Sequence, residues 1–156
     1  MKMDARLKRS GMTAEQYKDK LMEQIQDSLL TIHSVVRWLI LSLAVFGTAR
    51  SFVSMLSVSG RFTRLDVGVS LAYAGLLDFQ FLLGILLVLG ALTLQATIPW
   101  LHPIIMIPAI VVAHLSRRFA AQPDRTRHQR QLAIYLGSLA LIAIGLAVIG
   151  QLSLPR

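Results

Sequence analysis

Two histidines stand close to the starts of long apolar stretches, where an imidazole can bind a metal. His33 lies about one turn into the first stretch, and His102 opens the third. If both stretches are helices that start from the same side of a bundle, the two imidazoles lie at similar depth. Two imidazoles at one depth on different helices are the axial ligands that a b-type haem needs. The alternative is structural, with His33 as a polar anchor and His102 as a helix cap.

Arg37 follows His33 by four residues, which places both on one helical face. A guanidinium one turn deeper than the histidine can pair with a haem propionate, or with an anionic quinone or lipid headgroup. We therefore group Arg37 with His33 and His102 as candidate cofactor-binding residues, with the two histidines as the candidate metal ligands.

A second polar group lies inside the apolar stretches. Asp78 and Gln80 belong to the second stretch, and His114 to the far end of the third. His114 is about 18 Å along the helix from His102, so the two cannot share one iron. A carboxylate in hydrocarbon needs a partner, and a pair with His114 or Arg50 is the structural interpretation. A proton path through Asp78, Gln80 and His114 is the alternative. His128, in an arginine-rich loop, is expected to be solvated.

The elements that position these residues are four apolar stretches, at about 29–49, 68–94, 103–116 and 131–152. The chain has 156 residues, of which 54% are hydrophobic and 15% charged. A helix needs about 20 apolar residues to cross the hydrocarbon core of a bilayer. Short connections make neighbouring helices antiparallel. We predict an all-α fold, a four-transmembrane-helix up-down-up-down bundle with an N-terminal amphipathic helix.

Two units follow along the chain: residues 1–28, a basic tail and amphipathic interfacial helix, and residues 29–156, the four-helix transmembrane domain. Thr13 and Gln16 have capping-box spacing, and Tyr17, Leu21 and Ile25 share one helical face. Such a segment lies in the membrane interface or on a partner subunit. A simple polar lead-in to the first span is the other interpretation.

Charge and composition exclude several classes of protein. The chain has a net charge of +8, but its cations lie in the caps between spans and in the N-terminal tail rather than on one soluble face with interleaved aromatic residues, so we do not expect nucleic-acid binding. The chain has no cysteine, which excludes disulfides, iron–sulfur clusters and thioether-linked haem. With four antiparallel spans, both termini and the connection between the second and third spans share one side, the terminal side. The other two connections lie on the opposite side, the loop side. Eight arginines lie on the loop side, which favours cytoplasmic loops and external termini. They are Arg50, Arg61, Arg64, Arg117, Arg118, Arg125, Arg127 and Arg130.

Several motifs together resemble a small bacterial family of four-helix integral membrane proteins that is often labelled cytochrome b-like. The matching segments cover roughly residues 30–118: 30–38, which contains His-Ser-x-x-Arg-Trp; 61–66; 78–84, which reads Asp-Phe-Gln-Phe-Leu-Leu-Gly; and the pairs His102-Pro103 and Ala113-His114. The resemblance implies that His33, Arg37, Asp78, Gln80 and His102 belong to one shared polar set. An acidic residue commonly precedes the His-Pro pair in that family, and here Leu101 stands in its place. The last residues, Leu154-Pro155-Arg156, also differ from the ending that is common in that family.

These observations predict a multi-pass protein of the bacterial inner membrane that binds haem b and exchanges electrons with quinone or a partner complex. An alternative is a cofactor-free accessory subunit of a respiratory or photosynthetic complex. A third is a proton-coupled transporter that uses Asp78 and His114, although the chain lacks the internal repeat typical of transporters. The sequence carries none of the motifs of soluble enzymes, so an electron-transfer or accessory subunit is favoured over a stand-alone enzyme.

Overall fold

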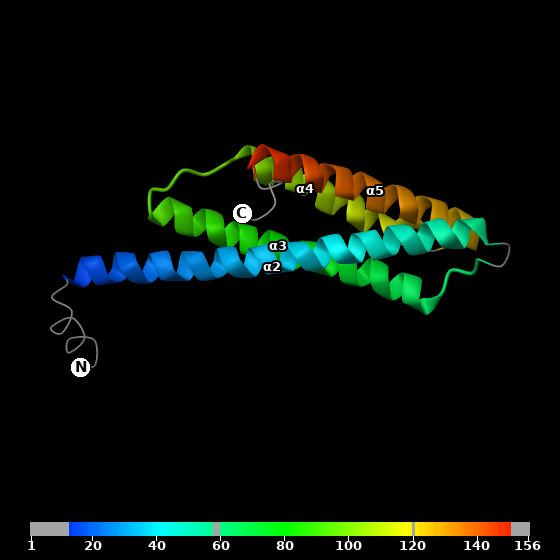
Figure 1. Ribbon diagram of the computed structural model, residues 1–156, viewed down its shortest axis with the longest axis horizontal. Coiled ribbons are helices and arrows are strands. Elements are labelled where there is room, and N and C mark those ends of the chain that lie inside the picture. The colour runs from blue at the N-terminus through cyan, green and yellow to red at the C-terminus, as the bar shows by residue number, and fades with distance from the viewer. Residues whose placement is uncertain (1–12, 58–59, 120, 151–156) are drawn as a thin grey trace.

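The computed structural model describes residues 13–57, 60–119 and 121–150, and all regular structure in that part of the chain is helical. The helices are α2 (Ala14–Leu56), α3 (Arg64–Thr93), α4 (Leu101–His114) and α5 (Asp124–Val148), with a short 3-10 helix, η1 (Leu115–Phe119), between α4 and α5. They lie roughly side by side in an elongated bundle (Figure 1). The predicted all-α class is therefore confirmed. The predicted basic tail, residues 1–11, and the ending 154–156 lie outside the described residues.

Helix α2 is longer than any single membrane span requires. It has 43 residues and is about 64 Å long at 1.5 Å per residue. Its start is fixed by the predicted capping box: the Gln16 amide donates to the Thr13 hydroxyl at 3.3 Å, and the Thr13 amide donates to the Gln16 side chain at 2.9 Å. The helix continues through the predicted boundary between residues 28 and 29. The segment that was predicted to be a separate amphipathic helix and the first apolar stretch therefore form one continuous helix.

Three helices, α2, α3 and α5, are long and apolar enough to cross a membrane by length and composition. Helix α4 is shorter, with 14 residues and a length of about 21 Å. Its helical path continues into the five residues of η1. The tighter 3-10 winding rises about 2 Å per residue, so α4 and η1 together reach about 31 Å, close to the thickness of a bilayer core.

The core lies where α2 packs on α3 and α5, and where α4 packs on α5. The buried residues of α2 that face this core recur every three or four positions, as residues on one helical face must. Tyr73 and Tyr135, the largest side chains of this core, meet edge to face with ring centroids 5.2 Å apart. Helices α3 and α4 contact each other less extensively than α2 contacts α3 or α5.

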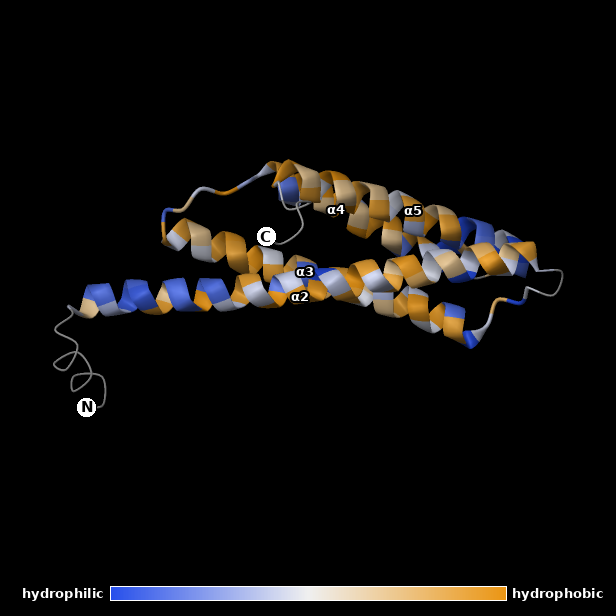
Figure 2. Cartoon of the chain, in the orientation of Figure 1, coloured by the Kyte–Doolittle hydropathy of each residue, from blue (hydrophilic) through white to orange (hydrophobic). Residues whose placement is uncertain are grey.

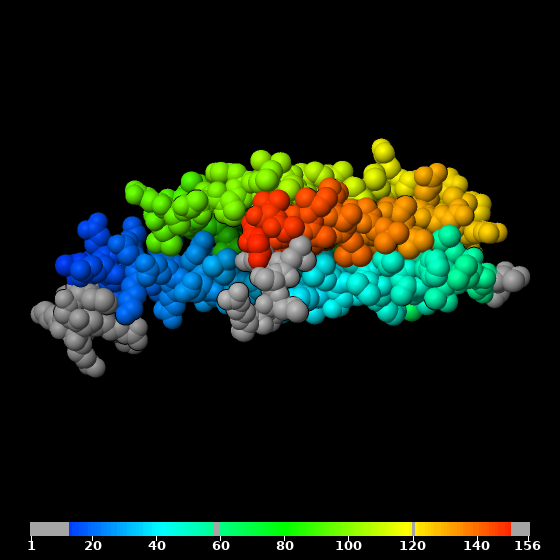
Figure 3. All heavy atoms as spheres, turned by 45° about the horizontal axis from the view of Figure 1, so that its top comes forward, coloured from blue at the N-terminus to red at the C-terminus, as the bar shows by residue number. Residues whose placement is uncertain are grey.

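Many of the large apolar side chains are exposed on the outside of the bundle. Among the described residues, those with exposed side chains include Leu39, Val45, Phe52, Leu82, Leu89, Ile107 and Ile144. Figure 2 shows hydrophobic residues over most of α3 and α4, and hydrophilic residues at the start of α2 and at the start of α5. In the space-filling view the helices form one elongated body, from which the start of α2 extends (Figure 3). An apolar exterior with polar ends is the surface that a bilayer requires.

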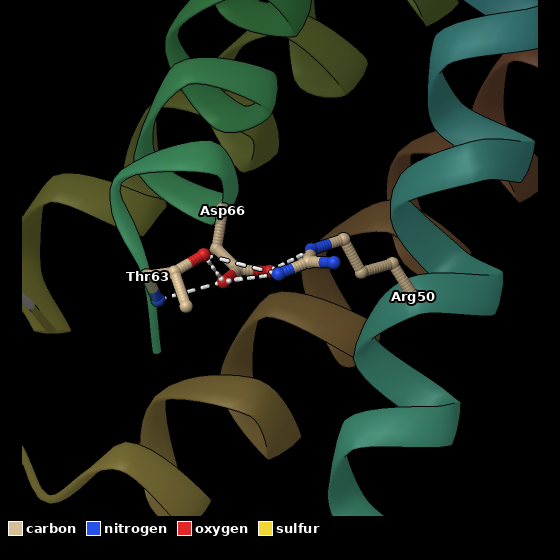
Figure 4. Close-up of polar contacts among 3 residues, drawn as sticks. All are labelled: Arg50, Thr63 and Asp66. Carbon is tan, nitrogen blue, oxygen red and sulfur yellow. Dashed lines mark hydrogen bonds and ion pairs between the residues drawn. The ribbon is translucent and has the colours of Figure 1, made fainter. Parts of the chain in front are cut away.

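An ion pair closes the loop end of the α2–α3 hairpin (Figure 4). Arg50 Nε donates to Asp66 Oδ1 at 2.6 Å and Arg50 Nη2 donates to Asp66 Oδ2 at 3.1 Å. The Thr63 amide and hydroxyl donate to the same carboxylate at 2.7 and 2.6 Å. Burial alone would raise the pKa of Asp66, but the hydrogen bonds from Arg50 and Thr63 outweigh it and lower that pKa to about 2. The same pair raises the pKa of Arg50.

Candidate functional site

The structure brings His33 of α2 and His102 of α4 together, with their rings edge to face. Their ring centroids lie 6.5 Å apart, with an angle of 67° between the ring planes. The meeting follows from the alternating direction of successive helices, because α2 and α4 then both run from the terminal side toward the loop side. Both rings are half-buried. The depth argument from sequence therefore placed the two imidazoles correctly.

His102 is held by a backbone group of α5. Its Nδ1 lies 3.1 Å from the carbonyl oxygen of Gly145. A carbonyl only accepts, so Nδ1 carries the hydrogen and Nε2 keeps its lone pair. A Cβ at Gly145 would meet the end of the Met106 side chain of α4, so glycine lets α4 and α5 pack closely at this point. The arrangement leaves Nε2 of His102 available as a ligand nitrogen, with its ring oriented by the second nitrogen.

Two polar atoms, one on His33 and one on Gln80, lack hydrogen-bond partners among the described residues. His33 Nδ1 and Gln80 Oε1 are buried, and neither has a hydrogen-bond partner among the described residues. Gln80 reaches this place from α3, where its Nε2 donates to the backbone oxygen of His33 at 2.9 Å. A buried polar atom without a partner costs about 1–3 kcal/mol. Two such atoms around a histidine pair indicate a position that a polar or metal-containing group would complete.

The pair fits the spacing that a haem iron requires. With metal–nitrogen bonds of about 2 Å, and about 1 Å from each nitrogen to its ring centre, two axial imidazoles have centroids about 6 Å apart. The separation of 6.5 Å between His33 and His102 is close to that value. No group of three or more potential metal-ligating residues occurs in the described part of the chain. Two protein ligands suit a haem, whose porphyrin supplies the other four.

Arg37 lies one turn beyond His33 on α2 and is half-buried. Its guanidinium carbon is 5.8 Å from the centroid of the Trp38 ring. The structure therefore keeps a cation within one helical turn of the histidine pair, as its spacing predicts.

Asp78 and His114 meet elsewhere, at the seam between α3 and α4. Asp78 Oδ2 lies 3.3 Å from His114 Nε2, while His114 Nδ1 donates to the Ile110 carbonyl at 3.0 Å. The Asp78–His114 contact is an ion pair only when the His114 ring is protonated. Of the two expected partners of Asp78, His114 is the one it contacts. Arg50 pairs with Asp66 instead.

Gln80 does not join Asp78 and His114. Residues two apart on a helix point to different sides, so Gln80 faces His33 while Asp78 faces the outside. The Asp78 side chain is 56% exposed and the His114 side chain 34%. The predicted set of Asp78, Gln80 and His114 thus separates into a member of the histidine site and an exposed Asp–His pair.

His128 was expected to be solvated, and that prediction is wrong. It is fully buried, and its ring centroid is 5.0 Å from that of Phe62. Neither ring nitrogen has a hydrogen-bond partner among the described residues. The missed signal is helical spacing: His128 lies on the same face of α5 as Gln131, Tyr135 and Ser138, all of which are buried.

Comparison of the chain with family models, with curated proteins and with solved structures gave no match.

Proposed function

We propose that this chain is a four-span protein of the bacterial inner membrane that holds one b-type haem between His33 and His102 and passes electrons between quinone and a partner complex. One observation carries the proposal: two imidazoles from different helices lie with their ring centroids 6.5 Å apart, and His33 Nδ1 and Gln80 Oε1 are buried without partners among the described residues. The supporting argument is that a bundle interior keeps such atoms only where something satisfies them.

Each residue of the site has a distinct task in this proposal. His33 and His102 would hold the haem iron, and the Gly145 carbonyl orients the His102 ring through Nδ1. The Gln80 amide holds the α2 backbone at His33 against α3. Arg37 offsets the negative charge of a propionate. Bound haem would supply a reversible one-electron couple, which no side chain of this site has by itself.

The membrane setting of the proposal rests on the outer surface. Helices α2, α3 and α5 have the length and composition of spans, and α4 with η1 supplies the fourth. The eight arginines of the loop side assign that side to the cytoplasm and both termini to the outside. The histidine pair then lies toward the outer face, where a single haem cannot carry electrons across the bilayer. A quinone or a partner complex must therefore take part.

An absorption spectrum tests the haem proposal directly. The protein is purified in a mild detergent from cells supplied with a haem precursor, and oxidised and reduced spectra are recorded. We expect a Soret band in the wild type, its loss in His33→Ala and His102→Ala, and its retention in His114→Ala. His114 is the matched control because it is a histidine of the same helix that lies about 18 Å from His102. A wild-type protein without a Soret band would refute the proposal.

A second candidate, a cofactor-free accessory subunit of a larger membrane complex, is supported by Asp78. A carboxylate that is 56% exposed on an apolar helix is poorly suited to contact lipid. A neighbouring subunit over the α3–α4 seam would cover it. Under this candidate the chain co-purifies with a complex, His33→Ala leaves co-purification unchanged, and Asp78→Leu weakens it. Dependence of the assembly on His33 would argue against it.

A further inference from the structure

A cavity of about 170 Å³ lies at the loop end of the bundle, away from the histidine site. It is far larger than the volume of about 15 Å³ that one water occupies on a comparable measure. Residues from the loop before α3, from α3, from η1 and from α5 surround it. The polar ones are Ser70, Ser116, Arg117, Arg127, Arg130 and Gln131.

Three of these residues are arginines, and no carboxylate is among the described residues that line the cavity. Two of the guanidinium groups are held by aromatic rings. The Arg127 guanidinium lies 3.8 Å from the centroid of Phe62, and that of Arg130 lies 5.3 Å from the centroid of Phe119. Stacking fixes the plane of a guanidinium and leaves its N–H groups free at the edge. Three cations around one cavity without a carboxylate favour the binding of an anion there.

The inner wall of the cavity supplies further hydrogen-bonding groups. Ser70 and Gln131 are buried, with 7% and 5% of their surfaces exposed, and they contact each other only loosely, at 3.5 Å. Val67 and Leu71, both exposed on α3, form an apolar edge beside them. The cavity therefore combines buried neutral polar groups, fixed cations and a strip of apolar surface.

We propose that this cavity binds a phosphoryl group. Guanidinium forks match phosphate oxygens in geometry as well as charge, and serine and glutamine side chains add neutral hydrogen bonds. Of the two sources of this group, the apolar edge of Val67 and Leu71 favours a phospholipid headgroup over free phosphate, since an acyl chain would continue along α3. The proposal is independent of haem, because its residues lie at the other end of the helices.

The test compares two double variants of equal charge. Arg117→Gln with Arg130→Gln removes two cations that line the cavity, whereas Arg118→Gln with Arg125→Gln removes two neighbouring cations that do not. Binding of phosphatidylglycerol to the full chain in neutral detergent is measured by native mass spectrometry, with phosphatidylcholine as the uncharged comparison. Thermal unfolding, measured in parallel with inorganic phosphate, tests whether free phosphate is the ligand instead.

We expect phosphatidylglycerol to bind the lining variant at least tenfold more weakly than the wild type, and the control variant about equally well, because only the former loses charge-assisted bonds. Arg117→Gln alone, in the exposed η1 helix, repeats the test if loss of the Arg130–Phe119 contact impairs folding. Thermal stabilisation by inorganic phosphate that the lining variant loses would support the site with phosphate as its ligand. Equal losses in both double variants, or no preference for either phosphate compound in the wild type, would overturn the proposal.

Discussion

The hydroxyl groups of Tyr73 on α3 and Ser138 on α5 share a hydrogen bond of 2.7 Å, and Ser138 in turn donates to the Ala109 carbonyl of α4 at 3.1 Å. Because the Ser138 hydrogen is used on Ala109, Tyr73 must be the donor to Ser138. Both side chains are buried. One serine thus joins three helices in the middle of the bundle.

This chain of bonds predicts an asymmetric double-mutant cycle. Ser138→Ala leaves the buried Tyr73 hydroxyl without a partner and should lower the free energy of unfolding by about 1–3 kcal/mol. Tyr73→Phe should cost less, since Ser138 still donates to Ala109. Thermal unfolding in detergent measures each variant. In the double variant, Tyr73→Phe should recover part of the loss caused by Ser138→Ala; strictly additive effects would contradict the assigned direction.

The Arg50–Asp66 pair predicts a loss of stability in acid. The folded-state pKa of Asp66 is about 2 and the reference value is 3.8, so the unfolded chain binds the proton first as pH falls. The pair's contribution is complete above about pH 4 and is lost between about pH 4 and pH 2. With the Asp66 side chain only 4% exposed, the contribution is about 2 kcal/mol.

Asp66→Asn should therefore lower the stability by about this amount at neutral pH and flatten its dependence on pH below about 4. The melting temperature in detergent, measured over this pH range, gives both quantities. Asp19→Asn, on the exposed start of α2, serves as the control and should leave the curve unchanged. A wild-type melting temperature that is constant from pH 4 to pH 2 would contradict the assignment.

Gly47 predicts a steric effect at the α2–α5 contact. A Cβ at this position would meet the Tyr135 ring, including its hydroxyl oxygen at 2.8 Å, and that ring is itself packed against Tyr73. Gly47→Ala should therefore cost about 1–3 kcal/mol. Gly75→Ala is the matched control, because nothing lies within 4 Å of its added Cβ. It should be neutral or slightly stabilising. Equal melting temperatures for the two variants would show that α2 and α5 are farther apart.

The contact between His102 and the Gly145 carbonyl predicts a single tautomer for the neutral His102 ring. Its bond to the Gly145 carbonyl requires hydrogen on Nδ1 and a free lone pair on Nε2. Nitrogen-15 NMR of histidine-labelled protein without haem, at a pH where the ring is neutral, should show protonated Nδ1 and unprotonated Nε2. Gly145→Val, which pushes against Met106 and His102, should allow both tautomers. Protonated Nε2 in the wild type would remove the preorganised ligand from the proposed haem site.

Periodicity and spacing predicted much of this arrangement. Hydropathy located all four helices, the capping box located the start of α2, and antiparallel order placed His33 opposite His102. Sequence could not decide between Arg50 and His114 as the partner of Asp78, because that depends on how each helix is rotated about its axis. Arg50 pairs with Asp66, whose carboxylate is already held at the start of α3 by its capping contacts with Thr63.

Other features depend on packing that no local pattern encodes. His128 looked like a loop residue because the arginines around it suggested solvent, yet α5 begins four residues earlier, at Asp124. Helix α4 begins before Pro103 and gives way to 3-10 winding at Leu115. The apolar stretch alone therefore did not give its length. The arginine-lined cavity draws on four separate segments, and only the folded bundle brings them together.

The unbroken course of α2 has a mechanical consequence. A helix without a hinge between Ala14 and Leu56 moves as one rigid unit. A displacement or rotation of its N-terminal end is therefore transmitted to His33 and, further along the helix, to Arg50. Whatever docks at the N-terminal end of this helix can thereby change the spacing of the imidazoles about five turns away.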